Sequence, residues 1–258
     1  MRRVLLIGVL AFGAACGSSP SPMAPGPPAV GGSPNPSTTP IRMLVLTATA
    51  GFRHDDAIRA VGPALVQIAL SNLGEFTFTQ TENLADIRAD TLINYNVIFF
   101  ACTTGELAFT DAQKAAIVNF VEQGGGFMGA HSATDTLYDW ADYGRIVGAY
   151  FKEHPWTQEA TVSVEDTSHP ATRALPSSFR LFEEYYTFRD NPRPRVHVLL
   201  SLNTASVGAQ GDYPLAWTQT IGQGRSFYTA LGHFAGTWND PRFRDHLVGA
   251  IRWVAKRD

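Results

Sequence analysis

The chain has 258 residues, of which 45% are hydrophobic and 17% charged, a balance that is ordinary for a globular protein. The net charge is −3, and removing Arg2 and Arg3 with a leader leaves 18 basic against 23 acidic side chains. A mildly acidic chain without a basic run lacks the charge pattern of a nucleic-acid-binding protein. The two cysteines, Cys16 and Cys102, cannot form a framework of disulfide bonds if Cys16 is modified.

The first 16 residues resemble an export signal with a lipid-attachment site. Two arginines precede an apolar run, residues 4–15, which is too short to cross a bilayer. The run ends in GAAC, and small residues before a cysteine resemble a lipobox. Gly13 stands where such motifs usually carry leucine, so ordinary signal cleavage just before the cysteine is the alternative. We expect residues 1–16 to be a signal with lipidation at Cys16.

The rest of the chain divides into a spacer and one domain. Residues 17–40 are rich in Pro, Gly, Ser and Thr and predict a semi-extended spacer. Residues 41–258 are enough for one large core. No other apolar stretch of the sequence is long enough to cross a membrane. This order favours an exported protein, a periplasmic or cell-surface lipoprotein whose only membrane contact is the lipid anchor.

Strands and helices alternate over the first half of the domain. Compact apolar runs predict buried strands. Asp55 and Asp56 are the expected N-caps of the first helix, and Thr110 that of the second. The alternation implies a mostly parallel sheet with helices on both faces, an α/β fold. The expected strands are 41–49, 76–80, 96–102 and 127–130, and the expected helices are 57–73 and 110–122.

The second half is richer in strands. The turn-forming sequence IGQG at residues 221–224 predicts that the last two strands form a hairpin. Asp240 and Pro241 open a final helix that carries its apolar side chains on one stripe. The expected strands are 161–164, 196–201, 215–220 and 225–229, followed by the helix 242–255.

Three histidines follow predicted strands. His54, His131 and His233 should lie at the carboxyl edge of the sheet, where ligands bind in folds of this class. Neutral imidazole binds metals and acts as a general base near pH 7. We expect these three to hold a divalent metal such as Zn²⁺, or to act in proton transfer, with His131 as a catalytic group. The alternative is that each histidine bonds a nearby loop carbonyl.

Two acidic positions are further candidates for catalysis. Glu183 and Glu184 are adjacent, and because neighbouring strand residues face opposite ways only one of them can enter the site. We favour Glu184 as a metal ligand or an acid/base group, with a solvated surface carboxylate as the alternative. Asp135 follows His131 closely and is expected to orient an imidazole or bind a sugar hydroxyl, with helix capping as the alternative.

Other side chains suit a sugar ligand. Aromatic rings stack on sugar rings, although large aromatics also pack in cores. Arg53 and Ser132 adjoin two of the histidines and complete the expected substrate contacts. The full expected set is Arg53, Ser132, His154, Trp156, Tyr186 and Trp238.

Several familiar motifs are absent or have a simpler explanation. The GGG run at residues 124–126 precedes a strand, so it ends a helix and is not a phosphate loop, and we expect no nucleotide cofactor. Cys102 ends an apolar run and is expected to pack as a small hydrophobic residue. The sequence contains no GxSxG, so the usual serine-hydrolase turn is missing.

The same segments resemble those of a known family. GFRH, GGGFMGAHSATDTLYDW, YGRIVGAYFKEHPW, EEYYTF and PLAWTQTIGQGRSFYTALGH, in this order, resemble the ThuA-like (trehalose-utilisation) proteins over residues 41–256. The resemblance implies the flavodoxin-like fold of class I glutamine amidotransferases. His131 then stands in the turn where those relatives carry a nucleophilic cysteine, so glutaminase activity is not expected.

The resemblance also implies a role in the metabolism of disaccharides and oxidised (keto) sugars. A metal at the histidines would polarise a sugar oxygen while a neighbouring group moves a proton. That chemistry would serve isomerisation, elimination or hydrolysis of a keto-glycoside. Two alternatives stay open: a non-catalytic carbohydrate-binding module, and a structural domain of a surface complex.

Overall fold

The computed structural model describes residues 39–258. The predicted signal segment with Cys16, and the spacer up to residue 38, lie outside the described residues. Within the described part, no helix is both long enough and apolar enough to cross a lipid bilayer.

The described residues form one nine-stranded sheet with a parallel half and an antiparallel half. The strand order is β2-β1-β3-β4-β9-β8-β7-β5-β6. Strands β2, β1, β3, β4 and β9 are parallel, and each pair from β9 to β6 is antiparallel. The strands are β1 (Ile41–Leu46), β2 (Phe76–Thr81), β3 (Val97–Ala101), β4 (Gly126–Ala130), β5 (Phe151–Val164), β6 (Ser178–Phe188), β7 (His197–Leu202), β8 (Pro214–Ile221) and β9 (Gly224–Thr229).

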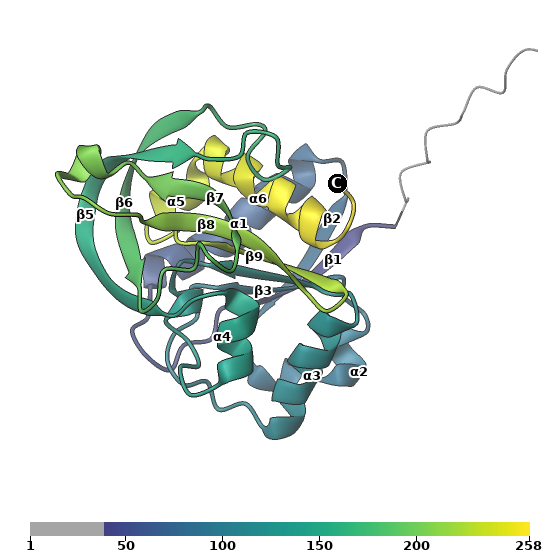
Figure 1. The fold of residues 1–258 in the computed structure, drawn as a ribbon. Helices are drawn as coiled ribbons and strands as arrows, with labels where there is room; N and C mark the ends of the chain where they lie inside the picture. Colours follow the sequence, from purple (N-terminus) through teal and green to yellow (C-terminus); the bar gives the residue numbers. More distant parts are fainter. Residues whose placement is uncertain (1–38) are drawn as a thin grey trace, which may run out of the picture. The chain divides into compact units, whose positions relative to one another are not determined.

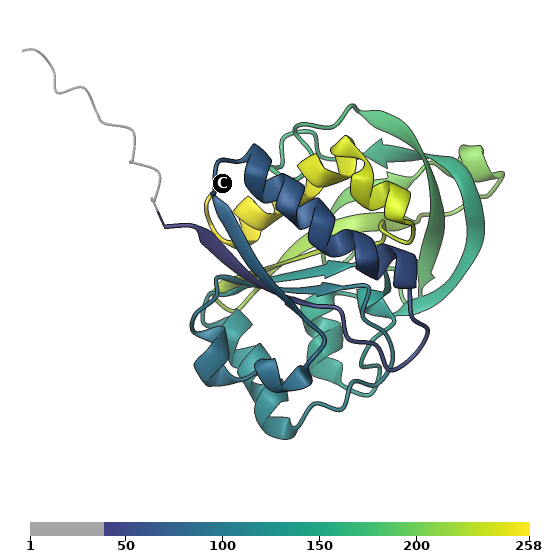
Figure 2. The same ribbon diagram turned by 180° about the vertical axis from the view of Figure 1, so that it is seen from behind.

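Helices cover both faces of the sheet, as the α/β prediction requires. Figure 1 shows α1, α5 and α6 on one face and α2, α3 and α4 on the other, and the view from behind in Figure 2 shows α1 running beside α6. The helices are α1 (Asp55–Ser71), α2 (Ala89–Leu92), α3 (Asp111–Glu122), α4 (Ala141–Val147), α5 (Ala235–Asn239) and α6 (Pro241–Val254).

The helix signals in the sequence act as expected in two places. Thr110 and Gln113 form a reciprocal capping box at the start of α3. Asp240 accepts the backbone N–H of Arg242 at 2.8 Å and caps α6, whose predicted apolar stripe is buried against the sheet. The hairpin between β8 and β9 is also confirmed.

Two predicted boundaries were wrong. The N-cap of α1 is His54, not Asp55 or Asp56, because the His54 carbonyl accepts the first helical hydrogen bond, from Ile58 at 2.9 Å. The strand expected at residues 161–164 is only the end of β5, whose earlier part pairs with β6 alone. Pro155 lies in this early part of β5, where the pairing with β6 is irregular between Phe151 and Trp156. The segment therefore does not look like a strand in the sequence.

Candidate metal centre

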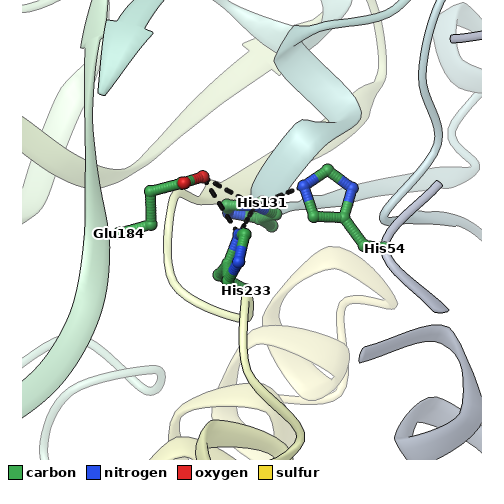
Figure 3. A group of neighbouring side chains, drawn as sticks. All are labelled: His54, His131, Glu184 and His233. Atoms are coloured by element: carbon green, nitrogen blue, oxygen red, sulfur yellow. Dashed lines mark hydrogen bonds and ion pairs between the residues drawn. The ribbon is translucent and has the colours of Figure 1, made fainter. Parts of the chain in front are cut away.

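Four side chains from distant parts of the chain converge at the carboxyl edge of the parallel strands. His54 follows β1, His131 follows β4 and His233 follows β9, as predicted, and Glu184 projects from β6. Figure 3 shows Glu184 and His54 on opposite sides, with His131 and His233 between them. One potential ligand atom from each residue lies within 4.8 Å of the other three. Within residues 39–258 this is the one group of three or more His, Cys, Asp or Glu side chains placed to hold a metal ion.

The backbone at His131 makes a sharp turn that presents its imidazole to the cluster. His131 has a φ of 51°, in the left-handed region that non-glycine residues rarely adopt. The Tyr228 hydroxyl donates to the His131 carbonyl at 2.7 Å, and the Tyr143 hydroxyl donates to the carbonyl of Ala133 at 2.6 Å. Buried tyrosines therefore hold the strained turn after β4 in place.

The hydrogen bonds of His131 leave one nitrogen as an acceptor. Its Nδ1 lies 3.0 Å from the carbonyl oxygen of Ala230, which can only accept, so Nδ1 carries the proton. The lone pair of Nε2 then faces His54 Nε2 at 3.1 Å, His233 Nδ1 at 3.0 Å and the Tyr186 hydroxyl at 3.0 Å. One lone pair accepts one hydrogen bond well, so at most one of these three neighbours can donate to His131 Nε2.

A divalent cation fits this crowded arrangement. Ligands 2.0–2.2 Å from a tetrahedral ion stand about 3.4 Å apart; four of the six separations between ligand atoms here are 3.0, 3.0, 3.1 and 3.6 Å, and all six are within 4.8 Å. Three imidazole nitrogens and one carboxylate oxygen form a donor set that suits Zn²⁺ and similar transition metals. The residues present therefore form a donor set that could hold a divalent metal ion.

Burial sets the protonation state that metal binding needs. Removal from water lowers the pKa of His54 to about 4, and it also lowers the pKa of His131 well below its usual value. Both imidazoles are therefore neutral at pH 7, which is the form that ligates a metal. The Ser132 hydroxyl, 3.4 Å from His54 Nδ1, orients the other nitrogen of His54 toward the cluster.

Glu184 enters the centre and Glu183 faces away from it, as strand alternation predicts. One oxygen of Glu184 lies 3.0 Å from His233 Nδ1 and 3.6 Å from His131 Nε2, and the other lies 3.2 Å from His154 Nδ1. Glu183 has a role that the sequence did not reveal. Its buried carboxylate accepts the backbone N–H groups of Gly232 at 2.9 Å and His233 at 3.1 Å. It therefore holds the loop that carries His233.

A cavity of about 250 Å³ opens beside the centre. Asp135 stands in its wall and accepts the hydroxyl of Tyr138 at 2.6 Å, and burial raises the pKa of this carboxyl. His154 lies at the mouth, with its side chain 49% exposed. A larger groove of about 480 Å³ between α2 and α3 has no carboxylate, histidine or cysteine in its lining, unlike the smaller cavity. The smaller cavity is lined by Phe52, His54, Asp135, Phe151, His154, Glu184, Tyr186 and His233.

Four of the residues expected to contact substrate, Ser132 among them, do not line the cavity. Trp238 is fully buried, and its indole N–H donates to the carbonyl of Gly232 at 2.9 Å, so its ring supports the His233 loop and cannot reach a sugar. Trp156 does not line the cavity and packs edge-on against Tyr213 at 5.0 Å. Arg53 also lies outside the lining, because its guanidinium pairs with both oxygens of Glu82 at 2.7 and 3.0 Å.

The sequence also missed two residues that line the cavity. Phe52 and Phe151 belong to its wall, and the Phe151 ring packs 4.3 Å from that of Tyr186. Phe52 could have been suspected because it lies two residues before His54. Ser132 is fully buried and contacts His54, so it positions a histidine and does not meet substrate. Cys102 is buried as expected, and burial raises the pKa of its thiol.

Comparisons with known proteins agree with this architecture. A protein described as ThuA-like from Bacteroides uniformis ATCC 8492 is 27% identical, with a TM-score of 0.73, over 86% of this chain and 95% of its own. Another, from Parabacteroides merdae ATCC 43184, is 21% identical, with a TM-score of 0.68, over 84% of this chain and 90% of its own. A glutamine amidotransferase from Thermotoga maritima shares the fold at 12% identity, with a TM-score of 0.52, over 84% of this chain and 98% of its own.

Two sequence comparisons complete the picture. A search of curated proteins finds no match. The sequence model of the family described as "Trehalose utilisation" matches residues 42–254, which include all four residues of the candidate metal centre. The chain therefore belongs to the ThuA family of trehalose-utilisation proteins.

Proposed function

We propose that this chain is a metal-dependent enzyme that moves a proton on an oxidised (keto) disaccharide, leading to isomerisation, elimination or hydrolysis. The observation that carries the proposal is the crowding of three polar atoms within 3.1 Å of the lone pair of His131 Nε2. At most one of these atoms can donate to that lone pair, whereas a shared cation would accept the lone pairs of all three imidazoles. Family membership supports carbohydrate as the substrate class.

The metal would be held by His54, His131, His233 and Glu184. Bound there, a divalent cation such as Zn²⁺ would act as a Lewis acid toward a sugar carbonyl or hydroxyl oxygen. The chain's own groups supply the rest of the chemistry. His154, at the cavity mouth, donates toward the second oxygen of Glu184 and so orients that carboxylate.

Asp135 is the proposed proton-transfer group. It lines the cavity without belonging to the cluster, and burial raises the pKa of its carboxyl above the ordinary value. The hydroxyl of Tyr138 fixes one of its oxygens at 2.6 Å, which leaves the other for a substrate proton.

The test compares metal-loaded protein and variants on 3-keto-disaccharides, with product identity read by mass spectrometry. His131→Ala should lose both the metal and turnover. Asp135→Asn should keep the metal and lose about 10²- to 10⁴-fold in kcat. His197→Ala, an exposed histidine outside the site, is the matched control. Unchanged turnover in His131→Ala would end the proposal, and sugar binding without turnover in the wild type would favour a carbohydrate-binding module.

We further propose export and lipid attachment at Cys16, on the strength of the sequence pattern of residues 1–16 alone. Metabolic labelling with a radioactive fatty acid tests it. Label on the wild type and none on Cys16→Ser is expected. Equal labelling of the two, or no labelling of either, contradicts the assignment.

A further inference from the structure

Two exposed aromatic side chains border the metal centre. Six large hydrophobic side chains are exposed among residues 39–258, and the only aromatic ones are Phe52, 68% exposed, and Phe182, 54% exposed. Single exposed aliphatic side chains are ordinary on a protein surface. That both exposed aromatics lie beside the one metal-competent cluster of the described chain indicates a shared purpose.

Contacts between rings connect these residues to the centre from two sides. The Phe52 ring lies 4.8 Å from that of His54, nearly perpendicular to it, and Phe52 also lines the cavity. Phe182 lies two residues before Glu184 on β6, so the two share a face of the strand. Its ring is 5.3 Å from Phe234, whose ring is 4.4 Å from His233. Phe52 lines the cavity, whereas Phe234 and Phe182 adjoin His233 without lining it. We call these three rings the aromatic rim.

The backbone at Phe52 is firmly held, so its exposure does not come from a loose loop. The Thr104 hydroxyl donates to the Phe52 carbonyl at 2.8 Å, and the N–H of Ala50 donates to the Thr104 carbonyl at 2.7 Å. On the other side, Arg53 is fixed by its bidentate pairing with Glu82. An aromatic side chain on a fixed backbone loses less conformational entropy when a ligand stacks on it than one on a mobile loop.

The cavity is too small for a whole disaccharide. Its volume of about 250 Å³ falls below the roughly 300–1,000 Å³ of pockets that enclose drug-sized ligands. A single sugar ring can enter and approach the metal-binding residues. A second ring joined to it must lie outside, against the rim.

We propose that Phe52 is the stacking platform for the second, non-reacting sugar ring, with Phe182 and Phe234 completing the rim. The inference rests on the proposed function and adds a specificity-determining subsite to it. The C–H groups on one face of a pyranose carry partial positive charge and meet the electron-rich face of a phenyl ring favourably. Phe52 would thereby make the site favour a disaccharide over a monosaccharide.

The experiment measures ligand binding, so it does not depend on turnover. Trehalose and glucose are titrated into the metal-loaded full chain by calorimetry, using wild type, Phe52→Ala, Phe52→Tyr and Leu70→Ala. Leu70 is a matched control, since it is also 68% exposed but lies near the other end of α1. Metal content is measured for each variant and must equal that of the wild type before affinities are compared.

Phe52→Ala should raise the Kd for trehalose about tenfold and the Kd for glucose less than twofold. Phe52→Tyr should bind trehalose as the wild type does. Leu70→Ala should also match the wild type. Equal trehalose Kd values for wild type and Phe52→Ala, or no trehalose binding by the wild type, would overturn the platform. Normal trehalose binding without turnover of any keto-sugar would instead sink the proposed reaction and leave the platform standing.

Discussion

Glu183 accepts the backbone N–H of His233 at 3.1 Å, while the next residue, Glu184, contacts the imidazole of the same histidine at 3.0 Å. Two adjacent carboxylates thus hold His233, one through its backbone and the other through its side chain. The strand geometry of β6 makes this possible, because consecutive side chains point to opposite faces. Glu183 is buried, and Thr237 donates a further hydrogen bond to it at 2.8 Å.

Replacing Glu183 with Gln should weaken both the fold and the metal centre. The amide would direct N–H groups at backbone and hydroxyl donors, which should lower the free energy of unfolding by about 1–3 kcal/mol. Displacement of the His233 loop should weaken metal binding about 10- to 100-fold. Urea unfolding and metal titration measure the two effects. The control is Glu159→Gln on the exposed face of β5, expected to change stability by less than about 0.5 kcal/mol. Matching results for the two variants would refute the role given to Glu183.

Gly249 in α6 offers a test of the packing beneath the sheet. Alanine normally stabilises a helix interior relative to glycine by about 1 kcal/mol. Here an added Cβ would collide with the carbonyl of Pro170 and lie 2.7 Å from Ala171 Cα. Gly249→Ala should therefore destabilise the protein by about 2–3 kcal/mol. Gly236→Ala, where an added Cβ meets nothing within 4 Å, should be neutral or slightly stabilising. Chemical denaturation of both variants decides, and a stable Gly249→Ala protein would contradict the observed packing.

Because His246 is buried in its neutral form, the free energy of unfolding should fall in mild acid. His246 is buried beneath the sheet and bonds the Ala171 carbonyl through Nδ1 at 2.7 Å, and burial lowers its pKa from 6.5 to about 4. The unfolded chain therefore takes up a proton near pH 6.5, before the folded chain does. The contribution of neutral His246 is complete above pH 6.5 and is lost as pH falls toward 4, by about 3 kcal/mol.

Unfolding free energies of chelator-treated protein between pH 4 and 8 measure this loss. His246→Asn keeps a donor for Ala171 but has no ionisable ring, so its pH curve should be shallower between 4 and 6.5. Between pH 7 and 8 the two curves should run parallel, which serves as the internal control. Equal slopes over the acidic range would show that His246 is not the source.

Much of the fold could be read from local patterns. Near-continuous apolar runs such as that of β3 are typical of strands buried on both faces, and the carboxyl-edge rule placed His54, His131 and His233 together. Strand alternation predicted that only one of Glu183 and Glu184 enters the site, and the favoured residue, Glu184, is the one that does. These inferences work because they depend on spacing along the chain.

The failures depend on tertiary contacts. The early part of β5 contains charged residues and Pro155, and it pairs with β6 alone. It therefore lacks the alternation of apolar and polar residues that is typical of a half-buried strand. Trp238 and Phe52 show the limit most clearly: the tryptophan is buried beneath a ligand loop, and the phenylalanine is exposed at the rim. The sequence analysis expected the tryptophan, not the phenylalanine, to contact a sugar. Only the packed structure shows which ring can meet a ligand.

The central claim is that His54, His131, His233 and Glu184 bind one divalent cation. Calorimetric titration of Zn²⁺ into chelator-treated full chain tests it directly, with His197→Ala as a surface-histidine control. The wild type and the control should bind one equivalent of Zn²⁺, and His131→Ala should lose that site while retaining the folded circular dichroism spectrum. A wild-type chain that takes up no Zn²⁺, or a His131→Ala chain that binds it as tightly as the wild type, would contradict the account.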